Sequence, residues 1–285
     1  MTLSATVVVA AEGLNLDLNG YTVSAKTGVK QLIKLAGPIA INDLSGSGTG
    51  ALVAKETNGD GGSVILSWGA HRVTVYGGTL DASAVSAATH GGAVRAANMT
   101  MYGGTVKGGN TTATWSAGGA LYLSNFTMYG GEVYGGKAAY GGAIAIVAGG
   151  KGNIHGGTIY AGKATYGGSI AMMASNSGKL TVTGGSIIGS SENAASGGGN
   201  IMLCDNTQME MSGGSITGGY ANNGGNIHGW SGAKLTITGG SITDGHAING
   251  NGGNINAGSI TLTIENATVS GGTATGQGQD IYPEA

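Results

Sequence analysis

The stretch LTITGGSI, residues 235–242, is one of eight related phrases that follow one another along the 285-residue chain. The others are VTVYGGTL from Val73, MTMYGGTV from Met99, FTMYGGEV from Phe126, GNIHGGTI from Gly152, LTVTGGSI from Leu180, MEMSGGSI from Met209 and LTIENATV from Leu262. Successive phrases start 26 to 29 residues apart. A nearly constant period in this range is typical of proteins built from stacked structural repeats.

Each phrase has the apolar pattern of a strand followed by a bend. Its first, third and eighth residues are apolar in nearly every copy, as Leu235, Ile237 and Ile242 are here. The first and third residues lie on one face, because side chains alternate along a strand with a period of two. The glycine pair interrupts that strand and predicts a bend, after which the eighth residue returns to the core.

A second glycine phrase follows in each repeat and ends in another apolar residue. It reads GGAV at Gly91, GGAL at Gly118, GGAI at Gly141, GGSI at Gly167, GGNI at Gly198, Gly224 and Gly252, and GQDI at Gly278. Small residues lie between the two phrases and predict a corner: Ala138, Ala164, Ala221, Ala247 and Ala274. No helical pattern of 10–15 residues separates the phrases, so each repeat holds two or three short strands.

These patterns predict an all-β chain that folds as a right-handed parallel β-helix. We expect a solenoid of about ten coils of 26–29 residues, with three short strands in each coil and a right-handed crossover. Residues 1–67 lack the clean repeat and are assigned to an N-terminal cap and irregular first coils. Residues 68–285 are assigned to regular coils of the same continuous solenoid domain.

The phrase LDLNGYTV, residues 16–23, adds a resemblance to a known group when it is taken with the LTITGGSI and GGNI phrases. Together they resemble the right-handed parallel β-helix proteins of the pectate-lyase-like superfamily, and most of all the Gly-rich repeat regions of bacterial surface proteins and adhesins. The resemblance covers essentially the whole chain. It implies the fold but no single function, since that superfamily includes lyases, hydrolases, adhesins and phage tailspikes.

Composition excludes several classes of function. Only 9% of residues are charged and the net charge is −2, so no basic field is present for nucleic acid. No apolar run reaches 18 residues, so we expect no membrane insertion. The segment after Met1 lacks the charged start and cleavage pattern of a signal peptide. We therefore expect the mature fragment of an extracellular or cell-surface protein.

The sequence shows no catalytic or metal-binding motif. The carboxylates are scattered, and Glu210 and Glu265 could meet only across an intervening coil, whereas a glycosidase pair lies roughly 5–10 Å apart. The five histidines have no HxH or HExxH spacing, and the single cysteine, Cys204, suits an inert, partly buried thiol. We expect no catalytic residue, no metal and no cofactor.

Polar residues fill one column just before the last apolar residue of the second phrase. They are Asn200, Asn226, Asn254 and Asp280. Amides stacked at the spacing of neighbouring strands can hydrogen-bond along the rod, so this column predicts a structural ladder. Contact with a polar ligand is the alternative.

Aromatic side chains are the strongest indication of a binding function. The candidate ligand-binding residues are Tyr76, Tyr102, Trp115, Tyr129, Tyr134, Tyr140, Tyr160 and Tyr166. Exposed aromatic rows can hold sugar rings or a partner surface. The alternative is that these rings stack on one another and stabilise only the contact between coils.

Three functions from different classes follow. The first is a non-catalytic, structural or adhesive rod of a bacterial surface protein, which binds a glycan or a host or bacterial surface partner through its tyrosine and tryptophan rows. The second is a polysaccharide lyase or hydrolase. The third is a filament subunit that self-associates coil end to coil end.

Overall fold

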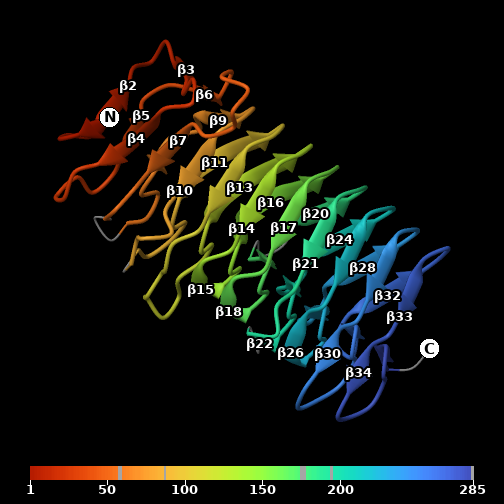
Figure 1. Ribbon diagram of the computed structural model, residues 1–285. Helices are drawn as coiled ribbons and strands as arrows, with labels where there is room; N and C mark the ends of the chain where they lie inside the picture. Colours follow the sequence, from red (N-terminus) through yellow and green to blue (C-terminus); the bar gives the residue numbers. More distant parts are fainter. Residues whose placement is uncertain (57–59, 87, 174–177, 193–194, 284–285) are drawn as a thin grey trace.

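The computed structural model describes residues 1–56, 60–86, 88–173, 178–192 and 195–283. Within these residues the chain forms 35 β-strands and no helix, and the strands wind into a rod of stacked turns (Figure 1). Pairings between the named strands are parallel, and each strand pairs with its equivalents one turn before and one turn after. The predicted all-β parallel solenoid of about ten turns is confirmed.

The strands form four parallel ladders that run along the rod. The first ladder contains β2 (Val7–Val9), β5 (Ile33–Leu35), β8 (Ile65–Leu66), β11 (Val94–Met101), β13 (Leu121–Met128), β16 (Ile144–Ile154), β19 (Ile170–Met172), β23 (Ile201–Leu203), β27 (Ile227–Gly229), β31 (Ile255–Asn256) and β35 (Ile281–Tyr282). The second contains β3 (Leu14–Asp17), β6 (Ile39–Asn42), β9 (Arg72–Val75), the same long strands β11, β13 and β16, and then β20 (Lys179–Val182), β24 (Gln208–Met211), β28 (Lys234–Ile237) and β32 (Thr261–Ile264).

The third and fourth ladders complete each turn. The third contains β1 (Thr2–Leu3), β4 (Thr22–Ala25), β7 (Ala51–Val53), β10 (Thr79–Asp81), β12 (Thr105–Lys107), β14 (Glu132–Tyr134), β17 (Thr158–Tyr160), β21 (Ser186–Ile188), β25 (Ser215–Thr217), β29 (Ser241–Thr243) and β33 (Thr268–Ser270). The fourth contains β15 (Lys137–Tyr140), β18 (Lys163–Tyr166), β22 (Ala195–Gly197), β26 (Tyr220–Asn223), β30 (His246–Ala247) and β34 (Thr273–Ala274).

The fourth ladder lies where the small residues predicted only a corner. Ala138 pairs with Ala164, and Ala221 pairs with Ala247, in register along the rod. The turn from β23 to β26 therefore carries four strands, whereas the turn from β2 to β4 carries three. Alternation of exposed Lys137 and buried Ala138 is that of an extended strand, and the alanine is small enough to face the interior.

The repeated apolar columns of both phrases line the interior of the solenoid. Leu235, Ile237 and Ile242 are fully buried, as are their equivalents in the preceding coils, such as Val73 and Met99. In the last coil the equivalents are only partly buried. Because each coil covers the apolar residues of its neighbours, burial of this surface is the main favourable term that holds the rod together.

The glycines of the second phrase are required for two different reasons, as the pair Gly224 and Gly225 shows. Gly224 has φ of 58°, a left-handed conformation that residues with a Cβ rarely adopt. A Cβ on Gly225 would overlap the carbonyl oxygen of Gly253 in the next coil and the backbone nitrogen of His246. The first glycine therefore sets the bend, and the second lets the coils approach each other.

A buried amide ladder runs through the interior of the later coils. Nδ2 of Asn226 donates to Oδ1 of Asn254 at 2.6 Å and to the carbonyl oxygen of Thr243 at 2.7 Å. Oδ1 of Asn226 accepts from Nδ2 of Asn200 at 2.8 Å and from the N–H of Gly219 at 2.9 Å. Asn226 is fully buried, and these four hydrogen bonds satisfy both N–H donors and both acceptor sites of its amide.

The ladder begins at a serine and ends at an aspartate. Oγ of Ser169 donates to Oδ1 of Asn200 at 2.9 Å, and Nδ2 of Asn254 donates to Oδ1 of Asp280 at 2.7 Å. A carboxylate accepts hydrogen bonds without offering donors of its own. Asp280 therefore ends this series without an amide N–H that would need a partner in a further coil.

In earlier coils a backbone carbonyl, rather than an asparagine side chain, accepts the corresponding hydrogen bond. The N–H of Gly136 donates directly to the carbonyl oxygen of Gly142 at 2.8 Å, and the ladder position in that coil is Ala143. In the later coil the equivalent N–H, that of Gly219, donates to the side chain of Asn226 instead. The asparagine thus supplies an acceptor that the backbone supplies elsewhere, which explains the change from alanine to asparagine along this column.

Candidate binding surfaces

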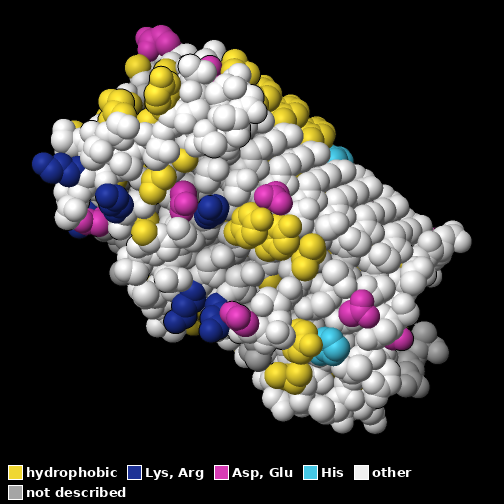
Figure 2. All heavy atoms as spheres, in the orientation of Figure 1, with side chains coloured by type: hydrophobic (Ala, Val, Ile, Leu, Met, Phe, Trp, Pro, Cys, Tyr) yellow, Lys and Arg dark blue, Asp and Glu magenta, His cyan; other side chains and the backbone are white. Residues whose placement is uncertain are grey.

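A row of three half-exposed tyrosines, which we call the tyrosine row, follows one edge of the rod. The ring centroids of Tyr76 and Tyr102 are 5.0 Å apart and their planes are inclined by 6°. The ring centroids of Tyr102 and Tyr129 are also 5.0 Å apart, with planes inclined by 9°. Their exposed fractions are 51%, 50% and 50%. His155 stacks on Tyr129 at 5.0 Å and ends the row, and Figure 2 shows apolar side chains along the upper edge that end at a histidine.

The tyrosine row offers less free ring face than separate exposed rings would. Each inner ring is stacked between two others, so its faces are partly covered. Centroids at 5.0 Å with nearly parallel planes are typical of offset stacking, which leaves edges, hydroxyl groups and part of each face open to solvent. The geometry suits contact between coils at least as well as it suits a ligand.

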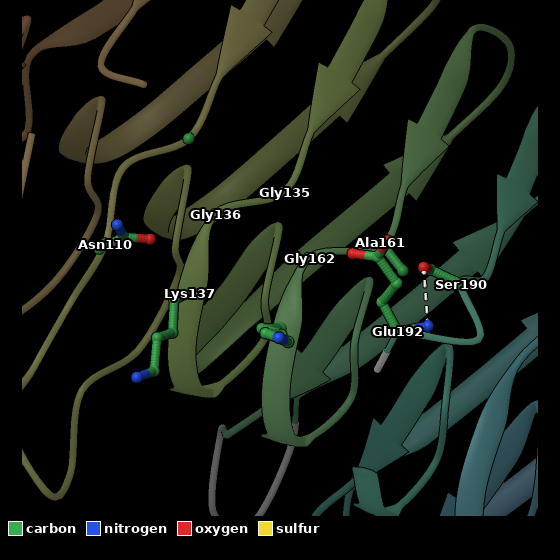
Figure 3. A pocket seen from close by; sticks show the side chains of 10 residues that line it. Asn110, Gly135, Gly136, Lys137, Ala161, Gly162, Ser190 and Glu192 are labelled. Atoms are coloured by element: carbon green, nitrogen blue, oxygen red, sulfur yellow. Dashed lines mark hydrogen bonds between the residues drawn. The ribbon is translucent and has the colours of Figure 1, made fainter. Parts of the chain in front are cut away.

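A groove runs along the corner between the third and fourth ladders. It joins two hollows of about 500 and 320 Å³, which share Gly108 and Gly135. Figure 3 shows the smaller hollow, with Asn110 and Lys137 at one end and Ser190 and Glu192 at the other. The floor is glycine because the coils are close here. A Cβ on Gly162 would overlap the carbonyl oxygen of Gly136, and one on Gly136 would overlap that of Gly109.

The two walls of this groove differ in chemistry. On the side of the third ladder, Lys107 and Tyr134 line the larger hollow, and Tyr160 and Ile188 continue the same column beyond it. The other wall is the column Asn110, Lys137 and Lys163. Figure 2 shows an apolar cluster in the middle of this face and a group of basic side chains below it in that view. The groove therefore combines an aromatic surface with hydrogen-bond donors.

Tyr134 is the aromatic residue that lines the larger hollow, and Tyr160 stacks on it from the next coil. Their ring centroids are 4.5 Å apart with planes inclined by 11°. The hydroxyl group of Tyr134 donates to Oε2 of Glu132 at 3.3 Å. Desolvation, followed by the neighbouring Glu132 charge, raises the pKa of Tyr134 above its usual value, so its hydroxyl stays protonated at neutral pH and remains a donor. Nearby, Lys107 and Asp81 form an ion pair at 3.8 Å.

A third surface, which we call the aromatic hollow, lies outside the main core. It has a volume of about 220 Å³ and is lined by Trp115, Tyr140, Met173, Cys204, Asp205 and Trp230. Tyr140 is only 7% exposed and Trp115 is 71% exposed, so the first forms a floor and the second a rim. Tyr140 also stacks on Tyr166 at 5.2 Å. The prediction treated Tyr140 as part of an exposed row, but aromatic and sulfur-containing side chains cover it.

Sequence reasoning missed Trp230 and Met173 in this hollow. Each is the third residue after the last apolar residue of a second phrase, and Cys204 holds the same place in the coil between them. If the alignment of the second phrases had been extended by three residues, it would have placed Met173, Cys204 and Trp230 in one column. The basic wall of the groove was also missed, although Lys137 and Lys163 hold equivalent places in consecutive coils.

The surroundings of the thiol in the hollow favour its protonated form. Burial, and then the negative charge of Asp205, raises the pKa of Cys204 from 9.0 to about 12. The thiolate, which is the reactive form, is therefore scarce at neutral pH.

Two of the histidines are partly buried. Burial is the main cause that lowers the pKa of His90 and of His228, so both imidazoles are neutral at pH 7.

Glu210 and Glu265, the two carboxylates considered as a pair in the sequence, lie in different columns of the solenoid. Glu210 pairs in register with Thr236 and through it with Thr263, so Glu265 belongs to a different column two coils away. Glu210 is instead 2.6 Å from Nζ of Lys179. Across the described part of the chain, no group of three or more His, Cys, Asp or Glu side chains is placed to hold a metal ion. The same residues contain no helix that is long and apolar enough to cross a membrane.

No protein-family model matches the chain, and neither the curated proteins nor the solved structures contain a match to it. The parallel solenoid is therefore established by the structure itself, and membership of the pectate-lyase-like superfamily stays a prediction.

Proposed function

We propose that the chain is a non-catalytic rod of a bacterial surface protein, located outside the cell, that binds a glycan along the groove beside Tyr134 and Tyr160. The observation that carries this proposal is the groove itself. Tyr134, with Tyr160 stacked on it, and the ammonium groups of Lys107, Lys137 and Lys163 lie along two adjoining hollows. Carbohydrate ligands need both a hydrophobic ring contact and polar partners for their hydroxyl groups.

The groove suits an extended chain better than a small molecule. Its walls repeat from coil to coil, because Lys107, Tyr134 and Tyr160 pair in register, as do Asn110, Lys137 and Lys163. Neighbouring positions on a wall are therefore separated by the strand spacing of about 4.8 Å. A polymer lying along the rod would meet a lysine and two tyrosines in one column, and an asparagine and two lysines in the other, at regular intervals, which supports an adhesive function.

The test is a glycan array followed by titration of the best glycan. We expect the chain to bind at least one glycan, and the double variant Tyr134→Ala with Tyr160→Ala to weaken that binding by at least about fivefold. Two ring contacts contribute roughly 1–3 kcal/mol, and 1.4 kcal/mol corresponds to a factor of ten. The measurement is the Kd from calorimetry.

The matched control is the double variant Tyr76→Ala with Tyr102→Ala, which removes two stacked, half-exposed rings from the tyrosine row. It should bind the glycan like the unmodified chain. Loss of binding in this control alone would move the site to the tyrosine row. Absence of binding to every glycan would remove the carbohydrate function.

A further inference from the structure

We propose that the aromatic hollow binds a quaternary ammonium group, the trimethylammonium head of a choline-type ligand. This site is separate from the groove and does not depend on glycan binding. Three aromatic rings and one carboxylate line it, together with the sulfur-containing side chains of Met173 and Cys204.

The rings form a stack of Trp115, Tyr140 and Tyr166, and Trp230 stands nearly at right angles to it. Trp115 lies parallel to Tyr140, with centroids 6.1 Å apart and planes inclined by 8°. Trp230 meets Tyr140 edge-on, with centroids 6.4 Å apart and planes at 85°. A cation is attracted by a ring face when it lies within about 6 Å of the centroid. Tyr140 is stacked between Trp115 and Tyr166, so the rings that can offer an open face to a cation in the hollow are Trp115 and Trp230.

The charge of the hollow favours a cationic ligand over a neutral or anionic one. Among the described residues that line it, Asp205 is the one charged side chain, and it is exposed at the surface. Cys204 beside it stays protonated, so the hollow carries one negative charge and no positive charge. A cation is favoured both by this carboxylate and by the negative faces of the rings.

The shortage of polar groups favours a fully methylated cation. A primary ammonium carries three N–H donors, and a sugar carries several hydroxyl groups, each of which loses hydrogen bonds to water when buried. Among the lining side chains, the oxygen acceptors for such donors are the carboxylate of Asp205 and the hydroxyl group of Tyr140. A trimethylammonium group has no donor to satisfy and presents methyl groups to the rings. The volume of about 220 Å³ also suits a head group rather than a drug-sized molecule.

The experiment compares choline with 3,3-dimethylbutan-1-ol, its neutral analogue of nearly the same shape, by calorimetry on the intact chain. We expect choline to bind several-fold more tightly than the neutral analogue, since the ring faces and the carboxylate of Asp205 attract a cation and not a neutral group. Equal binding of the two probes, or no binding of choline, would overturn the proposal.

Two variants locate the site without disturbing the core. Trp115→Ala removes an exposed ring, and Asp205→Asn removes the charge while keeping the shape. Each should weaken choline binding several-fold, whereas Trp68→Ala, which removes an exposed tryptophan outside the hollow, should leave it unchanged. Choline binding that survives both variants of the hollow would contradict the assignment.

Phosphocholine and phosphatidylcholine vesicles then distinguish the possible sources of the head group. Binding of phosphocholine in solution, lost in Trp115→Ala, supports a soluble or polymer-attached ligand. Binding confined to the vesicles, tested by co-sedimentation and lost in the same variant, supports a lipid surface.

Discussion

We expect Asn226→Ala to lower the free energy of unfolding by about 3–5 kcal/mol. The substitution removes four hydrogen bonds from a fully buried position. It leaves one N–H of Asn200 and the N–H of Gly219 without their acceptor, and each unsatisfied buried group costs roughly 1–3 kcal/mol. Urea denaturation followed by circular dichroism measures the loss.

The matched control for this substitution is Asn249→Ala. Asn249 also donates to an asparagine in the neighbouring coil, through Nδ2 to Oδ1 of Asn222 at 2.8 Å, but this pair is exposed to water. Its loss should change the free energy of unfolding by no more than about 0.5 kcal/mol. Similar effects from both substitutions would mean that the buried ladder has no special part in stability.

The second large effect is expected from Gly225→Ala, which should destabilise the chain by about 3 kcal/mol. The new Cβ would collide with the backbone of Gly253 and His246 in the next coil. Backbone atoms cannot turn aside as the end of a flexible side chain can, so the coils would have to separate locally. The measurement is again the urea denaturation midpoint, with its slope.

Gly218→Ala separates this collision from the cost of an unusual backbone conformation. Gly218 has φ of 66° and nothing lies within 4 Å of the position of an added Cβ. Its replacement should cost only about 1–2 kcal/mol, the penalty for a left-handed residue with a side chain. If Gly218→Ala were as harmful as Gly225→Ala, close approach of the coils would not be the reason for the second glycine.

The fold could be predicted from the sequence because the same few residues recur in every coil. The apolar columns that include Leu235 and Ile242 line the core, as a strand with a period of two requires. The glycine pairs also indicated the bends correctly. The fourth ladder was harder to predict, because Ala138 and Ala164 are small residues with weak strand preference, and they become strands only through pairing with neighbouring coils.

The candidate sites were less predictable because they arise between columns. Repetition identified the stacked tyrosines, but whether a ring such as Tyr140 stays exposed depends on side chains from other coils, among them Trp230. The groove depends on glycines from several coils, whose lack of a side chain leaves the corner hollow and lets the coils approach each other closely. No single motif therefore encodes the groove. Binding surfaces in a solenoid therefore need the relative placement of several columns, which the period alone does not supply.

Hydrogen–deuterium exchange with and without the best-binding glycan tests the central claim most directly. The account predicts that the glycan slows exchange in segments 105–110, 132–137 and 158–163, which form consecutive steps of the groove. Slower exchange confined to the segments around Tyr76, Tyr102 and Tyr129, or unchanged exchange along the groove, would contradict it.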